Sequence, residues 1–349
     1  MTQPQIVRAI DVGYGNTKHT MFHEAGQDIA CAVFPSIAPQ ASTGPDLSGG
    51  VFQRRNTFVV EVGNVRYEVG KDARVAQDAS YGRILDSAYS LTDTYLALVR
   101  GAIAYMGVPH IDLLMLGLPV NTYEQHHEAL AARIRGEHLV PDGDGKTTLV
   151  QVREVRVLPQ PIGGFFDHSI RHQLYGKMKS QMNLLIDPGY YTLDWVVAQG
   201  VKMLNSRSGA HSGGMSAILS AMGEAISRKL GTQLSDYSGI DDALRSGTNP
   251  RFYGKEFDLA EFVEIGKAKA RQFVAVLANK VGNGVDIDNI ILVGGGARFF
   301  LEVIQEKYPS HQIVIAEDPV FANVRGFQFA GEQFMNAANF ARQRNEVSA

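Results

Sequence analysis

Cysteine is almost missing from this 349-residue chain, which contains Cys31 and no other. A single cysteine cannot form an internal disulfide, and it excludes a metal site built from clustered thiolates. Chains without disulfides are typical of a reducing compartment, so we expect a cytoplasmic protein. The short polar start at residues 1–5 does not resemble a secretion signal, which favours the same expectation.

Long apolar runs and an excess of one charge are missing as well. No stretch approaches the roughly 20 apolar residues that cross a bilayer. The tail at 334–344 has too little basic charge for an amphipathic membrane anchor. The formal net charge is −3, and no basic face or tail marks a nucleic-acid binder. We therefore expect no membrane partner and no direct contact with nucleic acid.

What the chain does contain is enough sequence for two domains with apolar cores. Strand-like and helix-like segments alternate, which is typical of an α/β protein with layered sheets. Predicted strands cover residues 6–11, 16–22, 111–118, 150–158, 184–187, 192–198, 290–293 and 313–316, with a hairpin at 57–69. Predicted helices cover residues 95–106, 123–135, 165–181, 213–230, 262–281 and 324–340, and a surface loop covers 35–50.

Two helices carry more detailed expectations. Asn121 is a predicted N-cap for the helix at 123–135. The helix at 262–281 is predicted to bury four apolar side chains, which are Ile265, Phe273, Val276 and Leu277.

A short repeat links the two halves of the chain. The motif IDVGY at residues 10–14 recurs as IDPGY at residues 186–190, about half a chain length later. Both copies stand where a predicted strand ends and a hairpin returns. Two unrelated aspartate-containing turns would also explain the match, but the equal placement in each half favours an internal duplication.

Each repeat predicts a tight turn that can bind an anion. Glycine lets the backbone bend so that its N–H groups cradle phosphate oxygens. The first turn offers Gly13, Tyr14, Gly15 and Asn16, with Lys18 as a cation on the returning strand. The second turn offers Gly189, Tyr190, Tyr191 and Thr192.

The aspartate that begins each turn predicts a metal ion. Carboxylates beside phosphates repel them unless a cation lies between. Mg²⁺ suits this role because it keeps several waters and uses few protein carboxylates. Asp11 and Asp187 are therefore candidate ligands of a hydrated Mg²⁺. Taken singly, each is equally well read as a turn-capping aspartate.

Weaker signals lie outside the two turns. The glycine run at 294–296 follows an apolar strand and indicates close approach to a flat ligand, or merely a turn. Gly213 and Gly214 begin a helix whose N–H groups are expected to point outward. Glu264 and Lys267 share a helix face and form either a solvated ion pair or a contact with a base or ribose.

Gln160 lies between two prolines and is either an ordinary loop residue or a group that orients an attacking water. No serine, Ser36 included, stands in a nucleophile-elbow context.

Together the motifs resemble those of the actin, heat-shock-chaperone and sugar-kinase superfamily. IDVGYGNTK at 10–18 is similar to its first phosphate motif, LIDPGYYTLD at 185–194 to its second, and ILVGGGA at 291–297 to its adenosine motif. PQPIGG at 159–164 and DPVFANVRG at 318–326 resemble its two connecting elements. VGKDA at 69–73 and GLPV at 117–120 are similar to plasmid-partition actins of the ParM/StbA type.

The resemblance implies an actin-like fold, with two duplicated ribonuclease-H-like domains flanking a nucleotide cleft. Domain I would cover residues 1–160 and 322–349, and domain II would cover 161–321. The implied cofactors are ATP and Mg²⁺, with ATP preferred over GTP on the resemblance alone. Asp11 and Asp187 would bracket Mg²⁺ and the attacking water, and Gln160 would position that water.

The resemblance also implies which residues hold the nucleotide. Residues of the two turns would bind phosphates, chiefly Asn16, Lys18 and Thr192. The residues expected at the adenosine are Gly213, Gly214, Glu264, Lys267, Gly294, Gly295, Gly296 and Arg298. Two positions depart from the family: ParM-type proteins often carry glutamate at the position of Gln160, and Pro188 removes an amide donor.

The implied function is an ATPase that polymerises with itself and drives plasmid or DNA segregation through a DNA-binding adaptor. Two alternatives remain, a non-motor actin-like scaffold and a small-molecule kinase. A kinase needs a carboxylate base for the substrate hydroxyl, and the motifs offer none besides the two aspartates.

Overall fold

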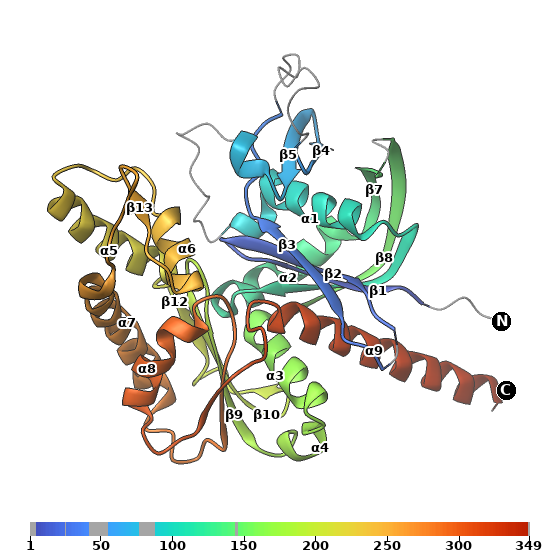
Figure 1. Cartoon of the computed structure of the whole chain (residues 1–349). Coiled ribbons are helices and arrows are strands. Elements are labelled where there is room, and N and C mark those ends of the chain that lie inside the picture. Colours follow the sequence, from blue (N-terminus) through green and yellow to red (C-terminus); the bar gives the residue numbers. More distant parts are fainter. Residues whose placement is uncertain (1–4, 25, 42–54, 77–87, 144–145, 348–349) are drawn as a thin grey trace. The chain divides into compact units, whose positions relative to one another are not determined.

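The computed structural model describes residues 5–24, 26–41, 55–76, 88–143 and 146–347, without the side chains of 342–347. The chain divides into two compact units. Unit 1 comprises Met1–Lys177 and Ala316–Ala349, and unit 2 comprises Met178–Ile315. Each unit is a mixed sheet with helices packed on it (Figure 1). The predicted α/β class is confirmed, and the loop predicted at 35–50 lies outside the described residues from residue 42 onward.

A six-stranded sheet forms the centre of unit 1. β1 pairs antiparallel with β2 and parallel with β6, and β6 runs parallel with β8. Across the sheet the strands are β3 (Ala30–Pro35), β2 (Asn16–Phe22), β1 (Val7–Val12), β6 (His110–Leu118), β8 (Thr147–Pro159) and β7 (Gly136–Pro141).

Helices cover both faces of this sheet. On one face Ile10 and Leu114 belong to the same core as α1 and α2. On the other face Val7 and Met115 lie against Gly331 of α9. The helices described in unit 1 are α1 (Asp93–Met106), α2 (Val120–Ile134), α3 (Gln160–Arg171) and α9 (Ala322–Val347), with short 3-10 turns η1 (Ala73–Ala76) and η2 (Tyr89–Leu91). The short helix α4 (Tyr175–Met178) crosses the boundary with unit 2.

Helices α3 and α9 pack backbone to backbone. A Cβ atom placed on Gly326 would lie 1.7 Å from the carbonyl oxygen of Gly163, so only glycine permits this approach. Next to the crossing, the Arg325 guanidinium donates to both oxygens of Asp167 at 2.7 and 2.8 Å. Both side chains are buried. A bidentate hydrogen-bond geometry of this kind is what a buried ion pair requires.

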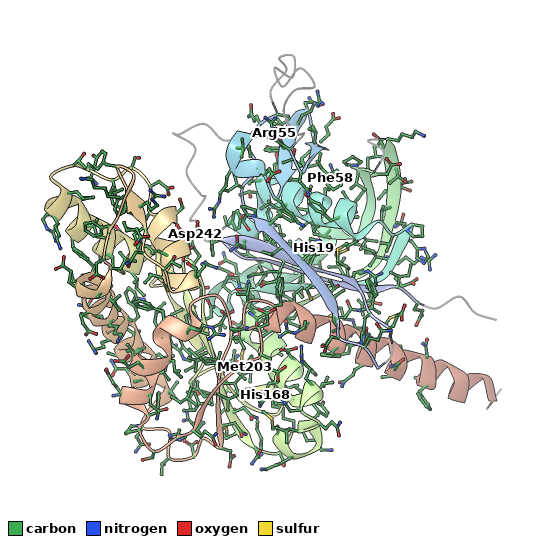
Figure 2. The ribbon with its side chains drawn as sticks, in the orientation of Figure 1. His19, Arg55, Phe58, His168, Met203 and Asp242 are labelled. Atoms are coloured by element: carbon green, nitrogen blue, oxygen red, sulfur yellow. The ribbon has the colours of Figure 1, made fainter. Side chains whose placement is uncertain are left out.

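A separate hairpin, β4 (Thr57–Val62) and β5 (Val65–Gly70), packs on α1. Its turn contains Gly63 with a φ of 59°, as the predicted glycine turn requires. Phe58 lies on β4 of this hairpin (Figure 2). Its ring lies edge-on to Tyr105 with 4.7 Å between ring centroids.

Unit 2 repeats the plan of unit 1 on a smaller scale. Its sheet has the order β11-β10-β9-β15-β16, and β12 also pairs with β10. The strands are β9 (Met182–Pro188), β10 (Leu193–Gln199), β11 (Lys202–Met203), β12 (Gly209–His211), β15 (Asn289–Leu292) and β16 (Ile313–Ile315). One core joins this sheet to α5 (Met215–Leu230), α6 (Ser238–Ser246), α7 (Ala260–Val281) and α8 (Ala297–Lys307). A small hairpin, β13 (Arg251–Phe252) and β14 (Lys255–Glu256), precedes α7.

Some predicted details are wrong. The predicted helix at 165–181 is instead α3 and α4, separated near Gln173, whose φ of 58° no α-helix accommodates. Helix α2 begins directly after Pro119, so Asn121 is not its N-cap. On α7, Phe273 and Leu277 are buried as predicted, but Ile265 and Val276 are each 39% exposed.

The compact units also end at other positions than the predicted domains. Residues 161–177, assigned to domain II from the sequence, lie in unit 1 because α3 packs on α9. None of the helices in the described parts of the chain is long and apolar enough to cross a bilayer.

Candidate functional site

The first glycine turn joins β1 to β2 in unit 1. The Gly13 amide donates to the Asn16 carbonyl at 3.1 Å and closes the turn. Ser36 supports it from the end of β3, because its hydroxyl donates to the Gly13 carbonyl at 2.5 Å and its amide to the Gly15 carbonyl at 3.1 Å. The Tyr14 ring stacks on Tyr89 with 5.1 Å between centroids. Sequence reasoning missed the supporting role of Ser36, for which no local motif exists.

Asp11 lies at the end of β1 and is almost fully buried. Each of its carboxylate oxygens has a partner. Lys18 Nζ lies 2.9 Å from Oδ2, and Gln160 Nε2 donates to Oδ1 at 2.6 Å. The structure thus brings together three residues predicted from the sequence. Lys18 lies opposite Asp11 on β2, and its charge offsets that of the Asp11 carboxylate.

The second glycine turn, in unit 2, has the same construction. The Gly189 amide donates to the Thr192 carbonyl at 2.8 Å, which matches the bond between Gly13 and Asn16. In the first turn Asp11 stands opposite Lys18, and in the second Asp187 stands opposite Asp194. The repeat predicted from the sequence is therefore a repeat of hydrogen bonding and register.

The two turns differ in charge. Where unit 1 sets Lys18 opposite its aspartate, unit 2 sets a second acid, Asp194, which is 2% exposed. Directly opposed residues of an antiparallel pair project to the same face with Cβ atoms about 4.5–5.5 Å apart. Two buried carboxylates at that spacing repel each other unless a cation offsets them. Asp194 was not predicted, although it follows Asp187 at the spacing with which Lys18 follows Asp11.

The start of α5 is fastened to the second turn. The amides of Gly214, Met215 and Ser216 donate to the carbonyls of Tyr191, Gly189 and Tyr190 at 3.0, 3.0 and 2.7 Å. The Gly213 amide donates to His211. The expectation that the amides of Gly213 and Gly214 point outward is therefore wrong. These glycines serve close packing, since a Cβ on Gly214 would lie 2.5 Å from the Gly189 carbonyl oxygen.

The glycine run at 294–296 lies against the same turn. Gly294 has a φ of 79°, and a Cβ there would lie 1.9 Å from Asp187 Oδ1. The Gly296 amide donates to the Pro188 carbonyl at 2.9 Å. The nearest groups to a Cβ on Gly295 would be the guanidinium nitrogens of Arg245. Unit 2 thus gathers the second turn, the α5 start and the glycine run around Asp187.

Three other predicted adenosine residues lie on the helices α7 and α8. Lys267 Nζ is 3.3 Å from Glu264 and 2.6 Å from Glu302, so the ion pair that the sequence left open is present. The hydrogen bond that Lys267 donates to the Glu302 carboxylate raises the pKa of Lys267. Arg298 is exposed on α8. A role for these three side chains at a base or ribose stays a prediction.

Comparisons with known proteins match both halves of the chain. The family model of actin-like proteins, N-terminal domain, matches residues 9–163. The model of the archaeal actin homologue MreB-like, C-terminal, matches residues 185–306. A search of curated protein sequences finds no match.

Solved structures resemble the whole chain. The archaeal actin homologue Ta0583 has a TM-score of 0.77 and 20% identity over 94% of this chain and 99% of its own, and it has also been solved in complex with ADP. The apo psk41 ParM protein has a TM-score of 0.70 and 20% identity over 95% and 98%. ParM in a 15-stranded filament from Clostridium botulinum has a TM-score of 0.75 and 21% identity over 95% and 100%.

These likenesses establish the actin-like fold. The two family models together span most of the chain, each on the half that carries one of the glycine turns. The chain therefore has an actin-like fold, and each of its halves matches a family model of actin homologues.

Proposed function

We propose that this actin-like protein binds ATP with Mg²⁺, forms filaments of its own chain in the ATP state, and uses hydrolysis to limit their stability. The observation that carries the proposal is the pair of equivalent glycine turns, each led by a buried aspartate in the same strand register. In unit 1 the aspartate lies opposite a lysine, and in unit 2 it lies opposite a second acid. A glycine turn beside a lysine suits a phosphate, and a glycine turn beside two acids suits a divalent cation.

The residues of unit 2 fit Mg²⁺. Asp187 is buried at the end of β9, and a second buried acid, Asp194, lies opposite it on β10. We propose that Asp187 holds the ion and that Asp11 contributes through a water molecule. When bound, Mg²⁺ would offset the charge of these carboxylates and of the phosphates. Lys18 would then exchange part of its contact with Asp11 for a phosphate oxygen.

Gln160 is suited to orient a water molecule. Its Nε2 donates to Asp11, so its Oε1 is the amide atom that can accept a hydrogen bond from water. The side chain is held in place by burial and by the close approach of Gly117, where a Cβ would lie 3.0 Å from Gln160 Cγ. Orientation of the attacking water is a role that glutamine has in other nucleotide hydrolases.

Nucleotide binding and assembly are also supported by what the similar proteins do. The archaeal actin homologue was solved with ADP, and the Clostridium botulinum ParM forms a 15-stranded filament. We propose that the filament segregates plasmid or other DNA through an adaptor. The net charge of −3 supports an adaptor, because a protein with this charge lacks the electrostatic attraction of general DNA binders.

The direct test is sedimentation with electron microscopy. We expect the purified chain to form pelletable filaments with ATP and Mg²⁺, and to remain soluble with ADP. A chain that stays monomeric with ATP and Mg²⁺ at every concentration would contradict the proposal.

A variant tests the role of Asp187. Asp187→Ala should still assemble with ATP but release phosphate much more slowly, since the acid that holds the cation is gone. The matched control is Asp242→Ala, which removes an exposed carboxylate on α6 (Figure 2). Unchanged phosphate release by Asp187→Ala would refute the role assigned to this residue.

A further inference from the structure

Unit 1 carries a groove that the nucleotide site does not use. It has a volume of about 1130 Å³, and its lining residues come mainly from the hairpin β4–β5 and the strands β7 and β8. Figure 1 shows these elements. Three apolar side chains in its lining remain exposed to solvent: Val59 by 39%, Leu139 by 59% and Leu149 by 48%. Leu139 and Leu149 are directly opposed on β7 and β8, so they form one continuous apolar wall. Exposed apolar side chains grouped in a concave surface are typical of a binding site.

Strands β4 and β7 lie next to each other at the groove. β4 is one of the two strands of its hairpin, β7 is the last strand of the six-stranded sheet, and no backbone pairing joins the two among the described residues. The groove is therefore suited to an inserted side chain rather than to an added strand.

Unit 2 carries a protruding group that fits such a groove. Tyr253 stands at the tip of the hairpin β13–β14 and is 78% exposed. Tyr253 and Gly254 have φ values of 51° and 76°. Turns with two positive φ values favour asparagine, aspartate and glycine, and a tyrosine there is a strained choice. Since an exposed ring adds little to the core of its own unit, the strain points to a contact outside it.

Charge favours the same pairing. The hairpin carries two exposed cations, Arg251 and Lys255, and one exposed acid, Glu256, which lies opposite Arg251. Among the described residues that line the groove, three are acids (Glu61, Glu137 and Asp142) and two are cations (Arg66 and Arg100). The hairpin thus has an excess of one positive charge, and the described groove has an excess of one negative charge. Glu137 is the exposed acid nearest to Leu139 in sequence.

We infer that the β13–β14 hairpin of one copy inserts Tyr253 into the β4–β7 groove of another copy. The hairpin β13–β14 and the groove are different surfaces of the same chain, so the contact between two copies is heterologous. Heterologous contacts generate open filaments when they do not close into rings. The inference rests on the proposed function, because it names one contact of the proposed polymer. A large aromatic side chain that packs against exposed apolar side chains such as Leu139 and Leu149 is also the type of residue that dominates interface energies.

Cross-linking of mixed single-cysteine variants tests the contact. A short bismaleimide should join Glu256→Cys on the hairpin to Thr147→Cys in the groove lining in the presence of ATP and Mg²⁺, giving a dimer band on a denaturing gel. Both residues are exposed, and their substitution leaves Tyr253 and Leu139 in place. The natural Cys31 should not interfere, because burial raises the pKa of its thiol to about 12. Val285→Cys, on a residue that is 85% exposed in unit 2, replaces Glu256→Cys in the control. Equal cross-linking with the control, or none with Glu256→Cys, overturns the inference.

Charge exchange separates this inference from the proposed function. Lys255→Glu and Glu137→Lys should each raise the concentration needed for pelleting at least about tenfold. The double variant should recover most of that loss, because each copy then carries the reversed pair. Wild-type filaments together with unchanged single variants overturn the inference and leave the proposed function intact. A wild-type chain that never assembles overturns both.

Discussion

Gln160 shows how much depends on one hydrogen bond at the scale of a residue. Its amide nitrogen is bound to Asp11 at 2.6 Å, which fixes the direction of its oxygen. Gln160→Ala removes the group that would orient water but leaves the glycine turns and Lys18 in place. We expect hydrolysis to slow by roughly 10- to 100-fold, while ATP affinity changes by less than about threefold. Single-turnover phosphate release and binding of a fluorescent ATP analogue measure the two quantities.

The comparison variant is Gln199→Ala, which truncates an exposed glutamine on β10 and should change neither quantity. Gln160→Glu is informative as well, because it sets a second carboxylate against the buried Asp11 and should raise the pKa of one of them. If Gln160→Ala loses affinity and hydrolysis to the same degree, the residue is structural and the proposed orientation of water is wrong.

At the scale of elements, the crossing of α3 and α9 is fixed by two glycines. A Cβ on Gly163 would lie 2.4 Å from the Asn323 carbonyl oxygen, and one on Gly326 would lie 1.7 Å from the Gly163 carbonyl oxygen. Backbone atoms cannot move aside as a side chain can. We therefore expect Gly163→Ala and Gly326→Ala each to destabilise unit 1 by about 3 kcal/mol, at the upper end of the usual cost of overpacking.

Scanning calorimetry of the full chain measures this effect, since a two-unit protein can unfold in more than one step. Gly176→Ala is the matched control, because a Cβ at that position in α4 meets nothing within 4 Å. It should be neutral or slightly stabilising, since alanine favours helix over glycine. If all three variants unfold at the same temperature, helices α3 and α9 can move apart at their crossing without loss of stability.

The elements also show where prediction from the sequence ends. Helix α1 and both glycine hairpins were predictable, because their apolar periodicity and glycine turns are local signals. Strand β7 and helix α8 were not predicted, and β7 exists because it pairs with β8. The exposure of Ile265 and Val276 was missed for a related reason, since periodicity cannot tell which apolar residues of a long helix meet a neighbour.

At the scale of the whole molecule, the duplication of the glycine turn was visible in the sequence. The difference in charge between the two turns, with Lys18 opposite one aspartate and Asp194 opposite the other, was not predicted. The two aspartates, their glycines and Gln160 were identified from the sequence, and the structure places those of each unit together. Ser36 and Asp194 needed the fold, because their roles come from strand pairing rather than from neighbours in sequence. The division at residues 177 and 316 likewise depends on packing, which no local pattern encodes.

Stability of the whole chain should fall at mildly acidic pH because of His19. This histidine on β2 is buried between Phe34 and Tyr105, and neither ring nitrogen has a hydrogen-bond partner among the described residues (Figure 2). Burial, followed by the charge of Lys71, lowers the pKa of His19 from 6.5 to about 4. Between these values the unfolded chain binds a proton that the folded chain does not, so folding is weakened as pH falls.

Compared with a chain that lacks this group, we expect no loss in the free energy of unfolding above pH 6.5. As the pH falls toward 4, the free energy of unfolding should fall by about 3 kcal/mol. His19→Phe is that reference, because it keeps an aromatic ring beside Phe34 and Tyr105 and cannot take up a proton. The two proteins should have similar urea midpoints at pH 7.5, and the variant should be the more stable one at pH 5. Since other groups, including His138 and His168 with lowered pKa values, titrate in both proteins, only the difference between them reports on His19. If the difference in urea midpoint between the two proteins stays constant from pH 7.5 to pH 5, His19 takes up a proton in the folded chain as readily as in the unfolded chain. Its ring would then have a partner that compensates the charge.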